Sequence, residues 1–285
     1  MQTSIERFFK GRTLVIATKH EKDRVLKPLL EQALGVKVIV PAHFDTDEFG
    51  TFSGEIQREQ AALETARRKC AEAARQTGES LVLASEGSFG GHPVIGFLPA
   101  DEEILLLKDE KHGLEFRAKV LSTKTNFAGS EYLDWEPLLF FASQVHFPSH
   151  ALILRGGKDD HTEIHKGITT WERLKESFHY FMKRNGKVYV ETDMRALHNP
   201  TRMKVILEAG EKLVETLAQL CPVCQGPGFD VAQIVRGLPC SQCEAPTPTA
   251  KAWVQVCQHC GHSATRHFPH TKEKEDPMFC DECNP

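Results

Sequence analysis

Short apolar runs alternate with helical patterns over the first 220 residues of the chain. Runs typical of strands occupy residues 13–17, 36–40, 81–84, 103–107, 115–121, 150–155 and 187–191. Apolar residues recur at helical spacing in 57–78, 171–184 and 198–220. Strands that alternate with helices in this way are typical of α/β layered domains. We therefore expect an α/β domain over residues 1–219, with a mixed central sheet flanked by helices.

Two of these helices carry signals at their ends. Gly78 follows the pattern of 57–77, at a place where a helix often ends in a left-handed residue. Asn199 and Pro200 combine a residue type that caps helix N-termini with one that favours the first helical position. We therefore expect the third helix to begin at Pro200 and to lead into the end of the chain.

Eight of the nine cysteines lie beyond residue 220, as four Cys-x-x-Cys pairs. Their distribution predicts a second module over residues 220–285, a small double zinc ribbon, because each pair offers two thiolates to one tetrahedral ion. Disulfides are the alternative, although a reducing compartment would keep these thiols free. The eight expected zinc ligands are Cys221, Cys224, Cys240, Cys243, Cys257, Cys260, Cys280 and Cys283.

The pairing of the four Cys-x-x-Cys turns into two zinc sites stays open at this stage. We expect turns that are neighbours in the sequence to share an ion, so that 221/224 joins 240/243 and 257/260 joins 280/283. A cross-braced or nested arrangement would use the same turns. In either case the two structural zinc ions replace a hydrophobic core that this stretch is too short to form.

Composition and charge narrow the classes of partner. The chain is 40% apolar and 26% charged, as expected of a folded, soluble protein, and it has no leader-like or 18-residue apolar segment. We therefore expect a cytoplasmic protein without a membrane partner. The formal net charge is −4, and residues 221–285 contain five Lys or Arg against seven Asp or Glu, which argues against nucleic acid. A protein partner that docks on the zinc module, and a homodimer, are possible.

Candidate chemistry follows the ends of the strands. Lys19 and Lys22 lie in a polar turn between the first strand and a helix, where they could face a phosphate, although a solvated first helical turn fits equally. Glu86 follows the third strand in a glycine-rich segment, SEGSFGG, that we expect to be a flexible turn. The loop after the second strand also carries acids, Asp45, Asp47, Glu48 and Glu55, which could equally cap the next helix.

A second charged constellation lies in residues 190–203. Glu191, Asp193, Arg195, Asn199 and Arg202 follow a strand and precede a helix, a place where open α/β sheets tend to bind ligands. Two arginines there could clamp a phosphate or a carboxylate. The alternative is an internal salt-bridge network that joins the α/β domain to the zinc module.

The order of three motifs resembles the inosine/xanthosine triphosphate pyrophosphatase superfamily. These motifs are TKHEK (18–22), ETARRKCAEAARQTG (64–78) and ASEGS (84–88), and the resemblance spans about residues 12–180. The closer likeness is to the non-standard purine nucleoside triphosphatases, whose corresponding turn reads G-I-E-G-G. The resemblance implies an ITPase-like fold, with Lys22 and Lys69 as phosphate contacts and Glu64 and Glu86 as acids that hold Mg²⁺ or orient water. Two positions depart from that pattern: Lys19 or His20 replaces an asparagine, and Ser85 replaces a second acid.

The whole chain is also similar to a bacterial family known as a domain of unknown function. The shared segments are DTDEFGTFSGE (45–55), ASEGSFG (84–90), ETDMRALHNPTR (191–202) and the terminal CDECNP. This similarity spans nearly the full length and implies little about activity.

Two functional hypotheses follow. The first is a metal-dependent phosphohydrolase or pyrophosphatase acting on a nucleotide or similar phosphorylated small molecule, and it requires the carboxylates of Glu64 and Glu86 to lie within about 4–6 Å of each other. The second is a non-catalytic protein that senses a ligand and docks through its zinc ribbons. For the hydrolase, the catalytic candidates are Glu64, Glu86 and Asp193, and the phosphate-binding candidates are Lys19, Lys22, Lys69, Arg195 and Arg202.

Overall fold

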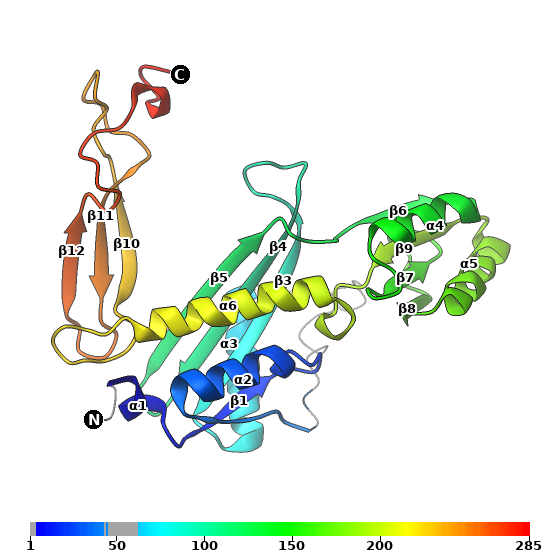
Figure 1. The fold of residues 1–285 in the computed structure, drawn as a ribbon, viewed down its shortest axis with the longest axis horizontal. Coiled ribbons are helices and arrows are strands. Elements are labelled where there is room, and N and C mark those ends of the chain that lie inside the picture. The colour runs from blue at the N-terminus through cyan, green and yellow to red at the C-terminus, as the bar shows by residue number, and fades with distance from the viewer. Residues whose placement is uncertain (1–3, 43, 45–61) are drawn as a thin grey trace.

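A computed structural model describes residues 4–42, 44 and 62–285, and three separate sheets organise them. The central sheet has five strands in the order β2-β1-β3-β4-β5 (Figure 1). β1 is parallel to β2 and β3, whereas β4 is antiparallel to both of its neighbours. The strands are β1 (Thr13–Ala17), β2 (Lys37–Ile39), β3 (Leu81–Gly91), β4 (Pro99–Asp109) and β5 (Leu114–Ser122).

Helices cover both faces of the central sheet. α1 (Ser4–Phe9), α2 (Asp23–Leu34) and α6 (Pro200–Ala218) pack on one face, in a core that contains Leu14, Leu83, Leu105 and Ile206. α3 (Ala62–Thr77) packs on the other face against Val82, Ala84 and Leu106. Since alternate residues of a strand point to opposite faces, these two sets of strand residues alternate along β3 and β4. The mixed α/β architecture expected from the sequence is therefore confirmed in its layers.

The expectation of one central sheet across residues 1–219 is wrong, because the chain leaves this sheet after β5 and builds a second one. β6 (Gly129–Tyr132), β9 (Val188–Thr192), β7 (Leu152–Arg155) and β8 (Ile164–Ile168) form a four-stranded sheet in that order. α4 (Trp135–Gln144) and α5 (Trp171–Asn185) pack with it around a separate apolar core. The apolar runs at 150–155 and 187–191 predict these strands correctly, but a run of that kind does not specify which strand it pairs with.

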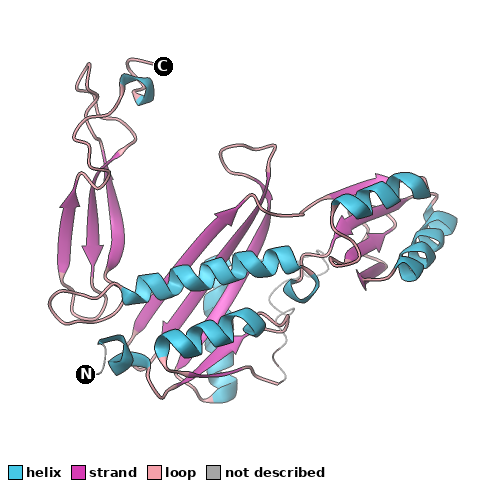
Figure 2. Cartoon of the chain, viewed as in Figure 1, coloured by secondary structure: helices cyan, strands magenta, loops and turns pink. Residues whose placement is uncertain are grey.

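The cysteine-rich end folds as a third sheet. Its antiparallel strands are β10 (Asp230–Arg236), β11 (Ala250–Val256) and β12 (Ser263–His267), followed by the short helix η3 (Pro277–Phe279). The four-stranded sheet and this sheet lie at opposite ends of the central sheet, and α6 runs between them across the central strands (Figure 2). The short helix η2 (Ala196–His198) precedes α6.

Local signals explain where the helices begin and end. Asn199 caps α6, because its side chain accepts a hydrogen bond from the backbone N–H of Arg202 at 2.9 Å. Gly78, at φ +72°, ends α3 with its N–H donating to the carbonyl of Ala74. No helix in the described part of the chain is both long and apolar enough to cross a lipid bilayer.

A buried ion pair fixes the end of the central sheet near the start of β1. Arg12 donates to both carboxylate oxygens of Asp109, at 2.6 and 2.8 Å, and His112 lies 2.7 Å from the same carboxylate. Burial raises the pKa of Asp109, but the hydrogen bonds from Arg12 and His112 outweigh burial and lower it. The side chain of Asp109 is fully buried, so this pair joins the chain before β1 to the β4–β5 hairpin in a water-poor setting.

Glu86 lies inside a strand, and the expectation of a flexible turn is wrong. The glycine-rich segment continues β3, and its residues pair in register with β4 from Leu81 opposite Asp109 to Gly91 opposite Pro99. Because β4 supplies a partner along this whole length, the glycines are held in an extended hairpin rather than in a loop. Glu86 is 2% exposed and pairs with Ile104 across the strands.

Candidate functional site

The eight clustered cysteines form two sets of four. Their Sγ atoms lie within 4.8 Å of one another in each set, and the closest pairs are Cys221–Cys260 at 3.7 Å, Cys224–Cys257 at 3.6 Å, Cys240–Cys283 at 3.9 Å and Cys243–Cys280 at 3.6 Å. Four thiolates about 2.3 Å from a tetrahedral zinc ion lie about 3.8 Å apart, whereas a disulfide places its sulfurs about 2.05 Å apart. The geometry of both sets therefore suits zinc, and none of these cysteines is in a disulfide in the described part of the chain.

The two sets are cross-braced, so the expected pairing of neighbouring turns is wrong. The turn 221/224 shares its site with 257/260, and the turn 240/243 shares its site with 280/283. The antiparallel order β10-β11-β12 explains this, because each strand carries the chain from one end of the sheet to the other. The first and third turns therefore meet at one end of the sheet, and the second and fourth meet at the opposite end.

The first zinc site packs against the central sheet. Gln258, between Cys257 and Cys260, accepts a hydrogen bond from the backbone N–H of Glu115 at 3.1 Å and donates to its carbonyl at 2.7 Å. The ring of His259 contacts Phe8 of α1 edge-on, with 5.3 Å between the ring centres. The turn that holds two of the zinc ligands is therefore also the turn that joins the cysteine-rich end to β5.

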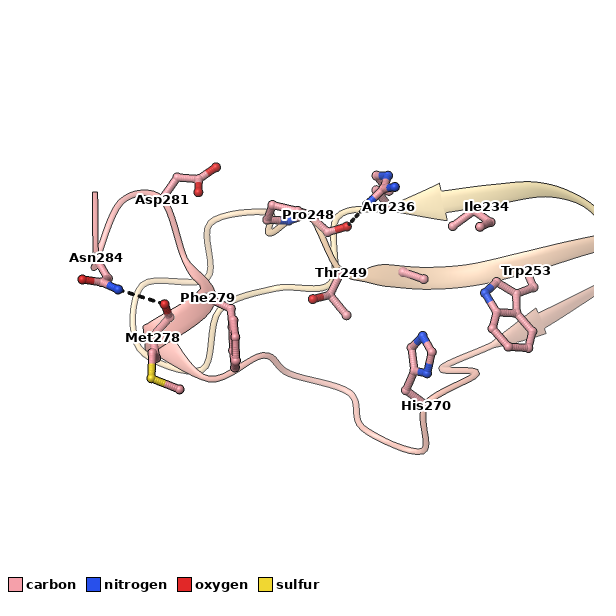
Figure 3. A pocket seen from close by; sticks show the side chains of 11 residues that line it. Ile234, Arg236, Pro248, Thr249, Trp253, His270, Met278, Phe279, Asp281 and Asn284 are labelled. Carbon is pink, nitrogen blue, oxygen red and sulfur yellow. Dashed lines mark hydrogen bonds between the residues drawn. The ribbon is translucent and has the colours of Figure 1, made fainter. Parts of the chain in front are cut away.

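The second zinc site lies beside an open groove of about 700 Å³ (Figure 3). Trp253 and Ile234 of the sheet line one side of it, and Met278 and Phe279 of η3 line the other. Ile234, Met278 and Phe279 are each more than half exposed. The docking role that the sequence leaves open for this module stays a prediction.

Buried charged side chains gather where β1 and β3 lie side by side and α2 begins. Lys22 donates to the hydroxyl of Ser85 at 2.8 Å, and the Nζ of Lys69 lies 2.5 Å from Oε1 of Glu86. All four residues are buried, with 2–7% of their surface exposed. Lys22 reaches the site from the turn after β1, whereas Lys69 reaches it from α3 on the opposite face of the sheet.

Burial also sets the charge of Lys22. Desolvation first, and then repulsion from Arg202, lower its pKa to about 7, against the opposite effect of Glu103 and Glu86. The amine is therefore close to half protonated near neutral pH. Glu21, next to it in the turn, adopts a left-handed φ of 58°, a conformation that costs energy for a residue other than glycine.

A second group of buried charges adjoins the first on the face that α6 covers. Arg202 donates through Nε to Oε1 of Glu103 at 2.6 Å and through Nη1 to the carbonyl of Met194 at 2.5 Å. Asp101 and Glu103 are fully buried. Both oxygens of Asp101, and Oε2 of Glu103, have no hydrogen-bond partner among residues 4–42, 44 and 62–285. Burial first, then the charge of Glu103 and a hydrogen bond that protonated Asp101 can share with it, raise the pKa of Asp101 to about 7, against the opposite effect of Arg202 and Lys22.

Gly87 makes room for this group. A Cβ atom at Gly87 would clash with Nη2 of Arg202 and would stand 2.5 Å from Oε1 of Glu103. The guanidinium of Arg202 lies over the ring of Phe89, 5.0 Å from its centre. The glycine in the SEGS segment is therefore required by the close approach of an arginine to the strand, and not by chain flexibility.

Asp101 and Glu103 are not among the site residues predicted from the sequence, because residues 103–107 have the pattern of a buried apolar strand. A signal was present, because two acids two residues apart point to the same face of a strand, and that face becomes fully apolar at Leu105 and Leu107. Two acids on the buried face of a strand are unusual enough to mark a site.

The structure brings together only some of the residues expected to act together. The pairs Lys22–Ser85 and Lys69–Glu86 adjoin one another along β3, on alternate faces of the strand, and Glu86 and Lys69 are near enough to affect the pKa of Lys22. Glu64 does not join them, because it lies about 140° around α3 from Lys69, is about half exposed and pairs with Arg67 at 3.3 Å. Lys19 is exposed, in contrast to Lys22 in the same turn.

The constellation in residues 190–203 is divided between separate contacts. Asp193 is buried and pairs with Arg195 at 2.5 Å, and it also accepts a hydrogen bond from the backbone N–H of Gly167 at 3.2 Å. Glu191 pairs instead with Arg155. Since Arg195 and Arg202 have different acidic partners, they do not form the expected clamp. The acids Asp45, Asp47, Glu48 and Glu55 lie outside the described residues.

Comparisons with known proteins place the chain in a family without assigning it an activity. A solved structure of the protein VC0702 from Vibrio cholerae aligns with 73% of this chain and 96% of its own, at 11% sequence identity and a TM-score of 0.31. A score that low supports no conclusion about the fold, and none of the comparisons shows the expected resemblance to the pyrophosphatases. No curated protein matches the chain. Residues 69–285 match the family described as a domain of unknown function, DUF6671, and the chain belongs to that family.

Proposed function

We propose that this protein is a divalent-cation-dependent phosphohydrolase that acts on a nucleotide or a similar phosphorylated small molecule, with a cation held by acids other than Glu64, which is exposed and paired with Arg67 instead of meeting Glu86. One observation carries the proposal: two buried pairs, Lys22–Ser85 and Lys69–Glu86, adjoin along β3 beside the edge where β1 ends and α2 begins. Burying charged groups costs several kcal/mol each, so clusters of this kind are concentrated at functional sites. Crevices at the carboxyl ends of parallel strands are the usual ligand sites of open α/β sheets.

The cationic groups suit a phosphate chain. Lys22 and Lys69 would neutralise charge on phosphate oxygens, and α2 begins directly after Lys22 without a side-chain cap, so that its dipole favours an anion beside that lysine. An anion beside Lys22 would raise the pKa of its amine and keep it protonated. The turn that carries Lys22 therefore combines a helix N-terminus with a buried amine.

Carboxylates at the site suit a divalent cation and an attacking water. Glu86 lies 2.5 Å from Lys69 on the face of β3 that α3 covers, and Asp101 and Glu103 provide further oxygens on the face that α6 covers. A bound Mg²⁺ would supply charge neutralisation on the phosphate oxygens and would activate a water molecule. Glu86 would orient that water, with Lys69 holding its carboxylate in place.

A turnover assay with matched variants tests the proposal. Zinc-loaded protein is incubated with Mg²⁺ and a panel of nucleoside mono-, di- and triphosphates, and released phosphate and pyrophosphate are measured. We expect turnover of at least one compound, and a loss of about 10²-fold or more in Lys69→Met and in Glu86→Gln. Lys19→Met is the matched control, because Lys19 lies in the same turn as Lys22 but is exposed. Wild-type protein that turns over none of the panel, or Glu86→Gln protein with full activity, would refute the proposal.

A further inference from the structure

Asp101 and Glu103 form an incomplete site on the buried face of β4. They stand opposite Phe89 and Gly87 of β3, and Ser85 stands opposite Leu105 two residues further on. Directly paired residues of antiparallel strands share a face, so both carboxylates project from the same side of the sheet as Ser85, where Lys22 is bound. They belong to the same cluster of buried charges as Lys22, one of the proposed phosphate contacts.

The neighbours in the described chain satisfy only one of the four carboxylate oxygens. Arg202 donates to Oε1 of Glu103 through Nε and to the carbonyl of Met194 through Nη1. Oε2 of Glu103 and both oxygens of Asp101 are buried without a hydrogen-bond partner in residues 4–42, 44 and 62–285. Unpaired carboxylates in a protein interior are strongly unfavourable, so a further positive species belongs between them.

Two species could occupy that place, a shared proton or a divalent cation. A proton bridges two oxygens and leaves the third unpartnered. A cation of the Mg²⁺ or Mn²⁺ type binds carboxylate oxygens as ligands, completes its shell with water and phosphate oxygens, and uses all three. The cation therefore accounts for more of the unsatisfied atoms than the proton does.

We infer that Asp101 and Glu103 hold the divalent cation of this site, and that Glu64 does not. The inference rests on the proposed function for the class of ligand. The exposed position of Glu64 and its pairing with Arg67 support the second part. Arg202 acts as a positioning residue in this arrangement, because it fixes one oxygen of Glu103 and leaves the other available to the metal.

Mn²⁺ binding without substrate provides the test, since it is independent of turnover. Zinc-loaded full-length protein is titrated with Mn²⁺, and free Mn²⁺ is followed by electron paramagnetic resonance. We expect one site per chain, with affinity at least tenfold weaker in Asp101→Asn and Glu103→Gln. Glu102→Gln is the matched control, because Glu102 lies between them on the opposite face and pairs with Lys119, and it should bind like wild type. Equal affinity in Asp101→Asn and wild type, or a tenfold loss in Glu64→Gln, would overturn the inference.

Wild-type protein alone provides a second measurement, in case a variant does not fold. Fe²⁺ in place of Mn²⁺, with ascorbate and peroxide, cleaves backbone near a bound ion. We expect cuts in β4 around residues 101–103 and in β3 around 85–87. Cuts near residue 64 instead of in β4 would place the ion at Glu64, and no Mn²⁺ binding by wild type would leave the pair to a proton. Either result would overturn the inference. Mn²⁺ bound at Asp101 without any turnover would refute the proposed function and leave this inference standing.

Discussion

Replacing Lys22 by methionine should stabilise the protein while abolishing its activity. Methionine fills a similar volume without the charge, so the substitution removes the desolvated ammonium group and the hydrogen bond to Ser85. Burial lowers the pKa of Lys22 from 10.5 to about 7. The folded state therefore disfavours the charged amine, and the free energy of unfolding of the wild type is reduced wherever that amine is protonated.

The size of the effect follows from the pKa shift and depends on pH. A difference of about 3.5 pH units at about 1.4 kcal/mol each gives an upper bound of roughly 5 kcal/mol below pH 7, where lysine is charged in both states. Loss of the hydrogen bond to Ser85 costs about 1 kcal/mol. The free energy of unfolding of Lys22→Met should therefore exceed that of wild type by about 2–4 kcal/mol at pH 6. Between pH 7 and 10.5 the unfolded chain binds one more proton than the folded protein. The free energy of unfolding of wild type therefore rises with pH, and the advantage of Lys22→Met over wild type shrinks to about 1 kcal/mol at pH 9.

Urea denaturation of the zinc-loaded protein at pH 6, 7.5 and 9 measures this difference. The same preparations are assayed for turnover, which should be lost because the phosphate contact is lost. Lys19→Met, in the same turn but exposed, should match wild type in both respects. A Lys22→Met protein that is less stable than wild type at pH 6, or whose stability difference does not change with pH, would refute this reasoning. A stabilised variant with full activity would show that Lys22 is not part of the site.

Three further predictions concern the fold. Gly87→Ala should lower the free energy of unfolding by about 1–3 kcal/mol, measured in urea, because the added methyl group displaces an arginine. Cys257→Ser and Cys280→Ser should each release one of two zinc ions per chain in a chromogenic chelator assay. Only Cys257→Ser should also lower the melting temperature of the central sheet, because the turn 257–260 contacts β5 of that sheet. Asp109→Asn should cost roughly 2–3 kcal/mol at neutral pH. That loss should shrink below about pH 4, because hydrogen bonds lower the pKa of Asp109 against the effect of burial and its stabilising charge is lost as the pH falls.

Each of these predictions has a matched control on the chain. Gly90→Ala should be neutral, since a Cβ at Gly90 would meet no atom within 4 Å. Glu110→Gln, beside Asp109 but exposed, should leave the pH dependence unchanged. Two zinc ions retained by either cysteine variant would contradict the assignment of the ligands. A Cys280→Ser protein whose central sheet melts like that of Cys257→Ser would contradict the separate roles of the two zinc sites.

Local features of this protein could be predicted from sequence wherever the determining interactions are short in range. Asn199 and Gly78 end helices through contacts with residues three or four positions away, so the sequence alone contains the signal. The strands of the central sheet were predicted for a similar reason. A short apolar run indicates a buried strand, whichever strand it pairs with. The zinc ligands were predicted because two thiolates on one tight turn already make half of a tetrahedral site.

Partners distant in sequence could not be predicted in this way. Glu86 was expected in a turn, because its glycines are flexible in isolation, and only the pairing of β3 with β4 makes that segment a strand. Asp101 and Glu103 were missed because an acid near the start of an apolar run is ordinarily at the surface, and it is the packing of α6 that buries them. The second sheet was missed because the alternation of strands and helices is the same whether one sheet forms or two.

The sequence by itself determined the residue types that this protein can use: eight thiolates for metal, two lysines and several acids near strand ends, and the helices and strands that carry them. The tertiary structure decided which of them meet. Strand direction alone set the cross-bracing of the cysteines, since an antiparallel sheet of three strands returns every second turn to the same end. Helical geometry separated Glu64 from Lys69, and strand pairing placed Asp101 and Glu103 beside Lys22 and Arg202. Local propensity acts over one helical turn or one strand, whereas a site is assembled across sheets, where direction and register determine which side chains come together.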